Sequence, residues 1–126
     1  MATPALDATN VVLLDGVVAG EPRRRQLPSG DTVMELDVTT RGAAGTCSVP
    51  VAWFGPPAAG AAIEAGREVV VVGFARRRFF RAGGVTQSRT EVVASRVARR
   101  DRPRDVVRLR AGLVDLLGAG GDGQRT

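Results

Sequence analysis

The sequence contains no histidine, lysine or tyrosine, and it has a single cysteine, Cys47. Without a second cysteine, neither an internal disulfide nor a thiolate metal cluster can form within the chain. The absence of histidine removes the commonest general base and metal ligand. Catalysis would have to rest on carboxylates, hydroxyls and arginine, and no arrangement of these residues indicates a reaction. We therefore expect a protein that is not an enzyme, needs no metal or cofactor, and leaves Cys47 inert.

Long apolar runs are also absent. No stretch approaches the roughly 18–20 apolar residues that span a bilayer. The first residues, MATPALDAT, have neither the basic start nor the apolar stretch of a signal peptide. The sequence therefore predicts a cytoplasmic protein without membrane contact. Its 126 residues suit one domain with short appendages, and its 44% hydrophobic content is enough for a buried core.

The positive charge comes from arginine alone. Eighteen basic residues stand against 13 acidic ones, which gives a net charge of +5. A GC-rich coding sequence would explain the choice of arginine over lysine. Whatever its origin, a guanidinium group pairs with phosphate through two parallel hydrogen bonds and stacks on flat rings. A basic balance in a non-catalytic domain favours a polyanion as the partner.

The order of predicted elements indicates an all-β barrel. Five segments have strand patterns, and residues 104–117 place apolar side chains at helical spacing, with Gly118 as a cap. Residues 55–66 have weak helical character, and the last residues, GAGGDGQRT, are expected to be disordered. The predicted strands are residues 10–19, 32–40, 47–54, 67–81 and 87–97.

Five short strands with one helix between the third and the fourth follow the order of an OB-fold. We therefore expect a five-stranded OB-fold Greek-key barrel with a short helix between strands 3 and 4 and a C-terminal helical tail. The expected organisation is a flexible leader at 1–9, an OB-fold domain at 10–99, and a C-terminal helix with a disordered tail at 100–126.

The stretch VVVVGFARRRFFRAGG, residues 69–84, begins as a buried run and ends as a cluster of arginines and rings. In a strand, Arg76, Arg78 and Phe80 share one face, and Gly83-Gly84 predicts a hairpin turn. Two guanidinium groups and a ring suit neither a core nor an ordinary solvated face. We expect this face to lie open to water and to grip unpaired nucleotides. The alternative is a charged strand that resists edge-to-edge aggregation, with its phenylalanines packed inside.

Four stretches of the sequence resemble, in order and spacing, the bacterial single-stranded DNA-binding protein family. They are residues 10–30 with Gly16, Glu21-Pro22 and Pro28-Ser29-Gly30; VAWFG at 51–55; Gly73 followed by Arg76, Arg78 and Phe80; and TEVVASRV at 90–97. The resemblance covers residues 10–98, which is the whole expected barrel. It implies an OB-fold that binds single-stranded DNA without sequence preference and assembles as a homodimer or homotetramer. It also implies a role in DNA replication, recombination or repair, in the cytoplasm and associated with the nucleoid.

Family members stack bases on aromatic rings and pair phosphates with basic side chains. Each stacked base contributes about 1–3 kcal/mol, and phosphate contacts weaken as salt rises. Phe80 is the first stacking candidate. Trp53 or Phe54 is the second, because adjacent strand residues point oppositely and only one of the two can face DNA. The candidate phosphate-binding residues are Arg25, Arg41, Arg76 and Arg78. Alternatively, residues 23–25 form a solvated loop and Trp53 fills the core.

Two departures from the family pattern keep other functions open. Aromatic residues make up only 4% of the chain, and the chain ends in GDGQRT instead of the acidic tip through which the family recruits repair enzymes. Recruitment through such a tip is therefore not expected. The alternative functions are a protein-interaction module and an RNA-binding barrel. A module would dock its C-terminal helix on a partner, whereas a merely structural helix would pack on its own barrel. The apolar residues concerned are Val106, Leu109, Leu113 and Leu116.

Overall fold

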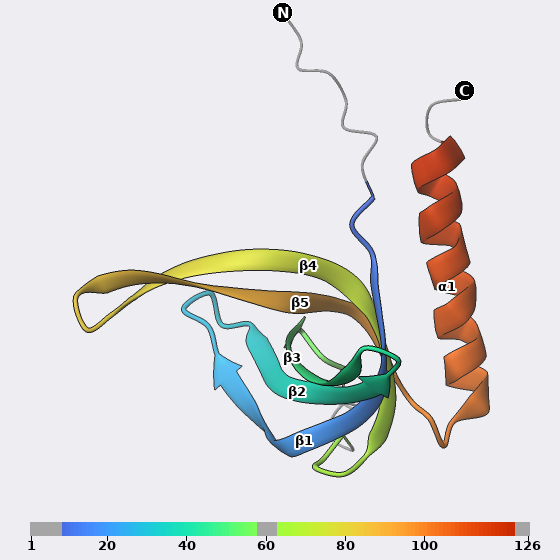
Figure 1. Cartoon of the computed structure of the whole chain (residues 1–126), viewed down its shortest axis with the longest axis horizontal. Coiled ribbons are helices and arrows are strands. Elements are labelled where there is room, and N and C mark those ends of the chain that lie inside the picture. Colours follow the sequence, from blue (N-terminus) through green and yellow to red (C-terminus); the bar gives the residue numbers. More distant parts are fainter. Residues whose placement is uncertain (1–8, 58–62, 123–126) are drawn as a thin grey trace, which may run out of the picture.

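The computed structural model describes residues 9–57 and 63–122, with residues 118–122 described by their backbone alone. Within these ranges the chain forms five strands followed by one helix (Figure 1). The elements are β1 (Val12–Gln26), β2 (Thr32–Gly42), β3 (Gly45–Phe54), β4 (Glu68–Ala82), β5 (Val85–Arg99) and α1 (Pro103–Asp122).

The five strands close into a barrel in the order β1-β2-β3-β5-β4. All neighbours are antiparallel except β3 and β5, which pair in parallel at Val51–Val92 and Ala52–Val93. The predicted all-β class, with a closed five-stranded barrel and a C-terminal helix, is confirmed.

The predicted helix between the third and fourth strands is not supported. Residues 55–57 and 63–66 are not helical, and residues 58–62 lie outside the described part of the chain. The segment begins Gly55-Pro56-Pro57, and these residue types are the weakest helix formers. Within the described residues, the helix of this fold is therefore C-terminal.

The barrel interior is filled mainly by aliphatic side chains from all five strands. Val38, Val69 and Val71 are fully buried inside the barrel. Their neighbours Val70 and Val72 point to the outside of the barrel, as alternation requires, and are buried there in a second cluster with Leu109 of α1. The inward-facing half of each strand contributes to one barrel core. Its members are Leu14, Val18, Met34, Leu36, Val38, Val51, Trp53, Ile63, Val69, Val71, Val92 and Ala94.

Two glycines mark places where backbones come into close contact. A Cβ atom on Gly16 would lie 2.2 Å from the carbonyl oxygen of Thr39, and one on Gly73 would lie 1.9 Å from that of Val93. Gly16 therefore permits a close approach of β1 to β2. The bulge in β1 lies further on, between Ala19 and Arg23. Such glycines let long strands bend around a small barrel.

Helix α1 packs on the outside of its own barrel. Leu109 is 1% exposed and lies against Val70, Val72 and Ala98, with Val106 and Leu113 beside them. The face proposed for partner docking is thus largely occupied by β4 and β5, although Leu116 remains 45% exposed. Most of the helix surface that an interaction module would offer to a partner is therefore already in contact with the barrel.

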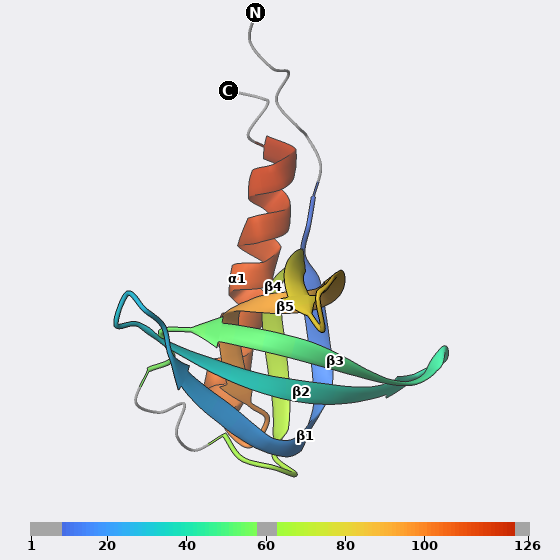
Figure 2. The ribbon, with the colours of Figure 1, turned by 90° about the vertical axis from the view of Figure 1, so that its left-hand side faces the viewer.

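The helix is longer than predicted. It continues through Gly118 to Asp122, so Gly118 neither caps it nor begins a disordered tail; residues 123–126 lie outside the described part. Glycine lowers helix propensity but leaves helical backbone angles accessible, so the end of the apolar pattern is not the end of the helix. In Figure 2 the second half of α1 extends away from the barrel. Within the described residues, no helix is long and apolar enough to cross a membrane.

Strands β4 and β5 run well past the barrel as a hairpin that overhangs one side of it (Figure 1). We call residues Arg76–Thr90 of this hairpin the arm. Gly83 and Gly84 both have positive φ, 62° and 79°, and they connect the Ala82–Val85 pair. This geometry is that of a two-residue hairpin turn, so the predicted Gly-Gly turn is confirmed.

Candidate nucleic-acid interface

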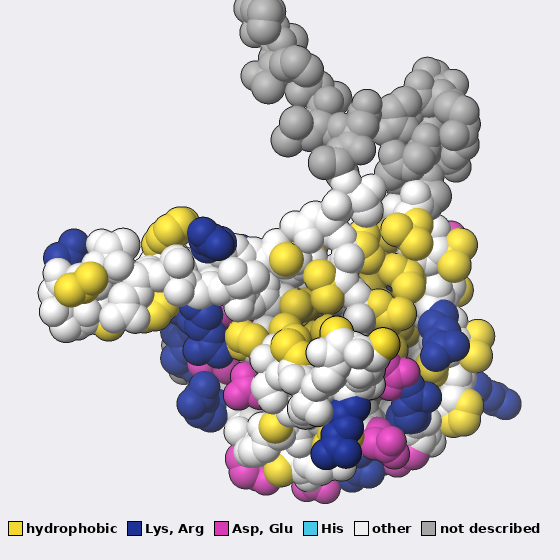
Figure 3. All heavy atoms as spheres, in the orientation of Figure 1, with side chains coloured by type: hydrophobic (Ala, Val, Ile, Leu, Met, Phe, Trp, Pro, Cys, Tyr) yellow, Lys and Arg dark blue, Asp and Glu magenta, His cyan; other side chains and the backbone are white. Residues whose placement is uncertain are grey.

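The arm is strongly basic. It contains five arginines and no aspartate or glutamate, and Glu91 follows immediately at its base. Figure 3 shows arginine side chains gathered beneath the overhang. The arginines of the arm are Arg76, Arg77, Arg78, Arg81 and Arg89.

The two-residue turn determines which residues of the arm lie opposite each other. Because Ala82 pairs with Val85, Phe80 lies opposite Gln87 and Arg76 lies opposite Glu91. Arg76, Arg78 and Phe80 are half-buried, whereas Arg77, Phe79 and Arg81 on the other face are exposed. The shared face of Arg76, Arg78 and Phe80 is therefore the one turned toward the rest of the molecule.

The expectation that this face lies open to water is corrected. Glu91 is only 4% exposed, and its Oε2 lies 2.6 Å from Nη2 of Arg76 and 3.6 Å from Nε of Arg78. The hairpin register places this carboxylate directly across from Arg76. Even so, the two arginine side chains keep 40% and 37% of their surface exposed. They are ion-paired yet remain partly accessible.

Each of these two arginines also lies over a ring. The Cζ atom of Arg76 is 5.3 Å from the ring centre of Phe54, and that of Arg78 is 5.6 Å from the ring centre of Phe80. Both distances fall within the range of cation–π attraction. The result is two guanidinium–ring pairs side by side with one buried carboxylate.

The adjacent rings of β3 have different environments. Phe54 is 40% exposed, whereas Trp53 is 7% exposed and belongs to the core. Of the two residues, Phe54 is therefore the outward one. Trp53 is withdrawn as a stacking candidate because its surface is taken up by core contacts.

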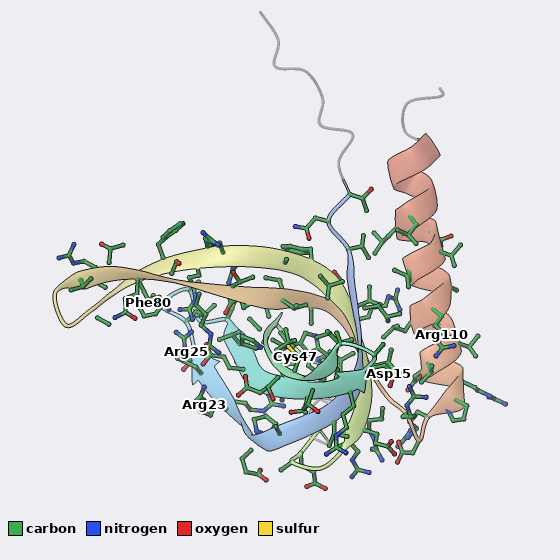
Figure 4. All side chains as sticks on the ribbon, viewed as in Figure 1. Asp15, Arg23, Arg25, Cys47, Phe80 and Arg110 are labelled. Carbon is green, nitrogen blue, oxygen red and sulfur yellow. The ribbon has the colours of Figure 1, made fainter. Side chains whose placement is uncertain are left out.

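Residues 23–25, the three consecutive arginines, are part of strand β1 and do not form the loop considered above. Arg23, Arg24 and Arg25 pair in register with β2, and Nη2 of Arg25 lies 3.1 Å from Oε2 of Glu35. In Figure 4, Arg23 and Arg25 extend from the end of β1 on the side of the molecule where the arm carries Phe80. A second ion pair connects the arm to β2, where Nη2 of Arg89 lies 3.9 Å from Oδ1 of Asp37.

Arg41 is not brought to this cluster. It pairs with Thr46 near the β2–β3 turn, whereas Arg25 pairs with Val33 at the start of β2. The separation of eight residues from position 33 to position 41 corresponds to about 26 Å along a strand. Cys47, also near this turn, is exposed and free, and the described residues contain no cluster suited to a metal ion.

Sequence reasoning missed three residues of the arm region. Phe79 is the most exposed large apolar residue on the arm, at 66%, and Arg77 lies on the same open face. Glu91 was missed although it could have been found. Once Gly83-Gly84 is taken as a two-residue turn, counting outward places Arg76 opposite Glu91.

No family model and no curated protein matches the chain. A solved structure described as the Plasmodium falciparum SSB complex with ssDNA matches with a TM-score of 0.62 and 21% sequence identity, over 79% of this chain and 98% of that chain. This likeness shows the fold, an OB-fold barrel of the SSB type, and confirms that part of the sequence interpretation.

Proposed function

We propose that this protein binds single-stranded DNA without sequence preference and catalyses no reaction. The observation that carries the proposal is the arm. It combines five arginines, no carboxylate, and a ring, Phe79, that is 66% exposed, on a fold shared with an SSB whose structure was solved in complex with ssDNA. A solvent-exposed phenylalanine among arginines offers a base a stacking surface beside groups that pair with phosphates.

The two faces of the arm supply the two components of such binding. Phe79 offers an uncovered ring for a base, and every base has a flat face, so stacking tolerates any sequence. Arg77 on the same face supplies charge for the phosphates. On the other face, the partly exposed guanidinium groups of Arg76 and Arg78 offer further flat surfaces beside Phe54 and Phe80. An extended strand would therefore contact the arm and the neighbouring end of β1.

The resemblance described above supports three further proposals about the cellular role. We propose that the protein is cytoplasmic, that it forms a homodimer or homotetramer, and that it acts in replication, recombination or repair. None of these proposals requires an acidic C-terminal tip.

The direct test is fluorescence anisotropy with a labelled oligo-dT, a DNA duplex and an oligo-rU of equal length, each at two salt concentrations. We expect oligo-dT to bind at least about tenfold more tightly than the duplex and to weaken as salt rises. Equal affinity for duplex and single strand would contradict the proposal. A clear preference for oligo-rU would move the function to RNA binding.

Ring substitutions test where binding occurs. We expect Phe79→Ala and Phe80→Ala each to weaken oligo-dT binding about fivefold, because each removes a stacking surface. Arg76→Ala combined with Arg78→Ala should weaken it by a similar factor. The matched control is Phe74→Ala, which removes a 41% exposed ring from β4 before the arm begins and should leave affinity unchanged. Equal effects from all these variants would remove the arm as the binding site.

A further inference from the structure

Glu91 is the one buried charged residue among the described residues, and it directly follows the arm, whose own charged residues are all arginines. A carboxylate on a surface that binds phosphates repels DNA, so we ask which role keeps Glu91 at this position. The same Oε2 atom contacts both Arg76 and Arg78. These are the two arginines whose guanidinium groups lie over rings.

We infer that Glu91 is a positioning residue for base stacking. Its carboxylate holds Arg76 on Phe54 and Arg78 on Phe80, so that each guanidinium–ring pair becomes a rigid flat platform for a base. This inference rests on the proposed function. An unpaired arginine is flexible, and ordering it on binding costs entropy that a preformed pair has already lost.

The geometry leaves the arginines able to bind while they are held. A guanidinium group has five N–H donors in a planar fork. Arg76 uses Nη2 for Glu91, and its Nε is buried without a hydrogen-bond partner among the described residues. Each side chain also keeps more than a third of its surface exposed. One edge of each plane is therefore anchored, and only the exposed part of each side chain, 40% for Arg76 and 37% for Arg78, is available to a nucleotide.

The sign of the effect separates this role from simple electrostatics. If Glu91 acts only through its charge, Glu91→Gln removes a repulsion and tightens binding to any polyanion. If Glu91 positions the platforms, the same substitution weakens binding to bases while leaving binding to a bare phosphate backbone intact. An oligo-dT and an abasic oligonucleotide of equal length distinguish the two cases, because they share the backbone and differ in the bases.

A matched control comes from β2. Asp37 also pairs with an arginine of the arm, Arg89, but at 3.9 Å and with half of its side chain exposed. Arg89 lies over no ring among the described residues. Asp37→Asn therefore removes the same charge without disturbing a platform. We expect it to tighten binding to both oligonucleotides about twofold.

The experiment measures the affinity of wild type, Glu91→Gln and Asp37→Asn for both probes, with folding checked by circular dichroism. We expect Glu91→Gln to weaken oligo-dT binding about five- to tenfold and to leave abasic binding equal or tighter. Tighter or unchanged oligo-dT binding, or equal losses on both probes, would overturn the inference while leaving the proposed function standing. Failure of wild type to bind oligo-dT would overturn both.

A second variant tests the same inference if Glu91→Gln does not fold. Arg76→Lys combined with Arg78→Lys keeps both charges and the ion pairs but replaces flat guanidinium groups with compact ammonium groups. We expect the same selective loss on oligo-dT. If this folded variant binds oligo-dT as tightly as wild type, guanidinium platforms play no part and the role assigned to Glu91 is wrong.

Discussion

The side chain of Asn10 forms both hydrogen bonds that a neighbouring strand would offer to Ala75. Its Nδ2 donates to the Ala75 carbonyl oxygen at 2.8 Å, and its Oδ1 accepts from the Ala75 N–H at 2.9 Å. The contact lies immediately before the arm begins at Arg76. Asn10 thus extends the contact of β1 with β4 two residues beyond the Val12–Gly73 pair and anchors the base of the arm.

Replacement of Asn10 by alanine should therefore loosen this base. We expect Asn10→Ala to lower the free energy of unfolding by about 1–2 kcal/mol, the usual range for two exposed hydrogen bonds. Urea denaturation measures this loss, and amide hydrogen exchange at Ala75 should become faster. Unchanged exchange at Ala75 would show that the contact does not protect the strand.

Gly73 should tolerate no side chain. A Cβ atom there would lie 1.9 Å from the carbonyl oxygen of Val93, which belongs to a paired strand and cannot move aside. We expect Gly73→Ala to cost about 3 kcal/mol or more, as severe overpacking does. Gly42→Ala is the control, since nothing lies within 4 Å of its added Cβ. Thermal unfolding of both variants measures this cost. Equal melting temperatures would contradict the close approach of Gly73 to the Val93 carbonyl oxygen.

Leu109 should anchor helix α1 to the barrel. It is 1% exposed against Val70, Val72 and Ala98, whereas Val107 on the opposite face is 67% exposed. We expect Leu109→Ala to destabilise the protein by about 2–4 kcal/mol and Val107→Ala to have little effect. Chemical denaturation measures both variants.

Truncation after Asp101 addresses the role of the whole helix. Because the arm and the end of β1 form the proposed binding surface, oligo-dT binding should survive removal of α1. If the truncated protein remains folded and no longer binds oligo-dT, α1 is part of the binding site.

Asp101 should give the helix attachment a weak dependence on acid. The hydrogen bond from the Arg99 guanidinium lowers the pKa of the Asp101 carboxyl below its ordinary value of 3.8, against an opposing effect of desolvation, and the charges of Arg67 and Arg102 add to the lowering. A carboxyl group with a lowered folded-state pKa stabilises the fold above its unfolded pKa and loses that contribution as pH falls through the folded pKa. The effect is small, because the group is exposed and screened by solvent.

The measurement is the melting temperature of wild type and Asp101→Asn at low salt. The difference between the two should be present at neutral pH and should disappear as the pH falls below the ordinary Asp value. A difference that persists unchanged in acid would mean that the ion pairs of Asp101 with Arg99 and Arg67 are not its source.

The strands were largely predictable because their signals are local. The strand pattern at residues 32–40 and the glycine pair at positions 83–84 are properties of a few neighbouring residues, and the strand and the turn are both found as predicted. The length of α1 was underestimated because apolar spacing reports the packed half of a helix. Its later turns carry glycines, and its described side chains from Val114 to Leu117 are exposed.

The environment of the candidate site was less predictable because it depends on closure of the barrel. Sharing of a face by Arg76, Arg78 and Phe80 follows from alternation, and the position of Glu91 follows from the turn. Contact between Arg76 and Phe54 could not be predicted in this way. Arg76 belongs to β4 and Phe54 to β3, and these strands are connected only through β5, which pairs with β3 over a short parallel stretch. For the same reason alternation alone left open which of Trp53 and Phe54 is buried.

The most direct test of the binding surface is photo-crosslinking with an oligonucleotide that carries 5-iodouracil in place of thymine, followed by mass spectrometry of the crosslinked peptides. If bases stack on the arm, crosslinks will concentrate at Phe79 and Phe80, with a weaker signal at Phe54. Crosslinks confined to the β2–β3 turn or to α1, with the arm unlabelled in a protein that binds the probe, would contradict this account.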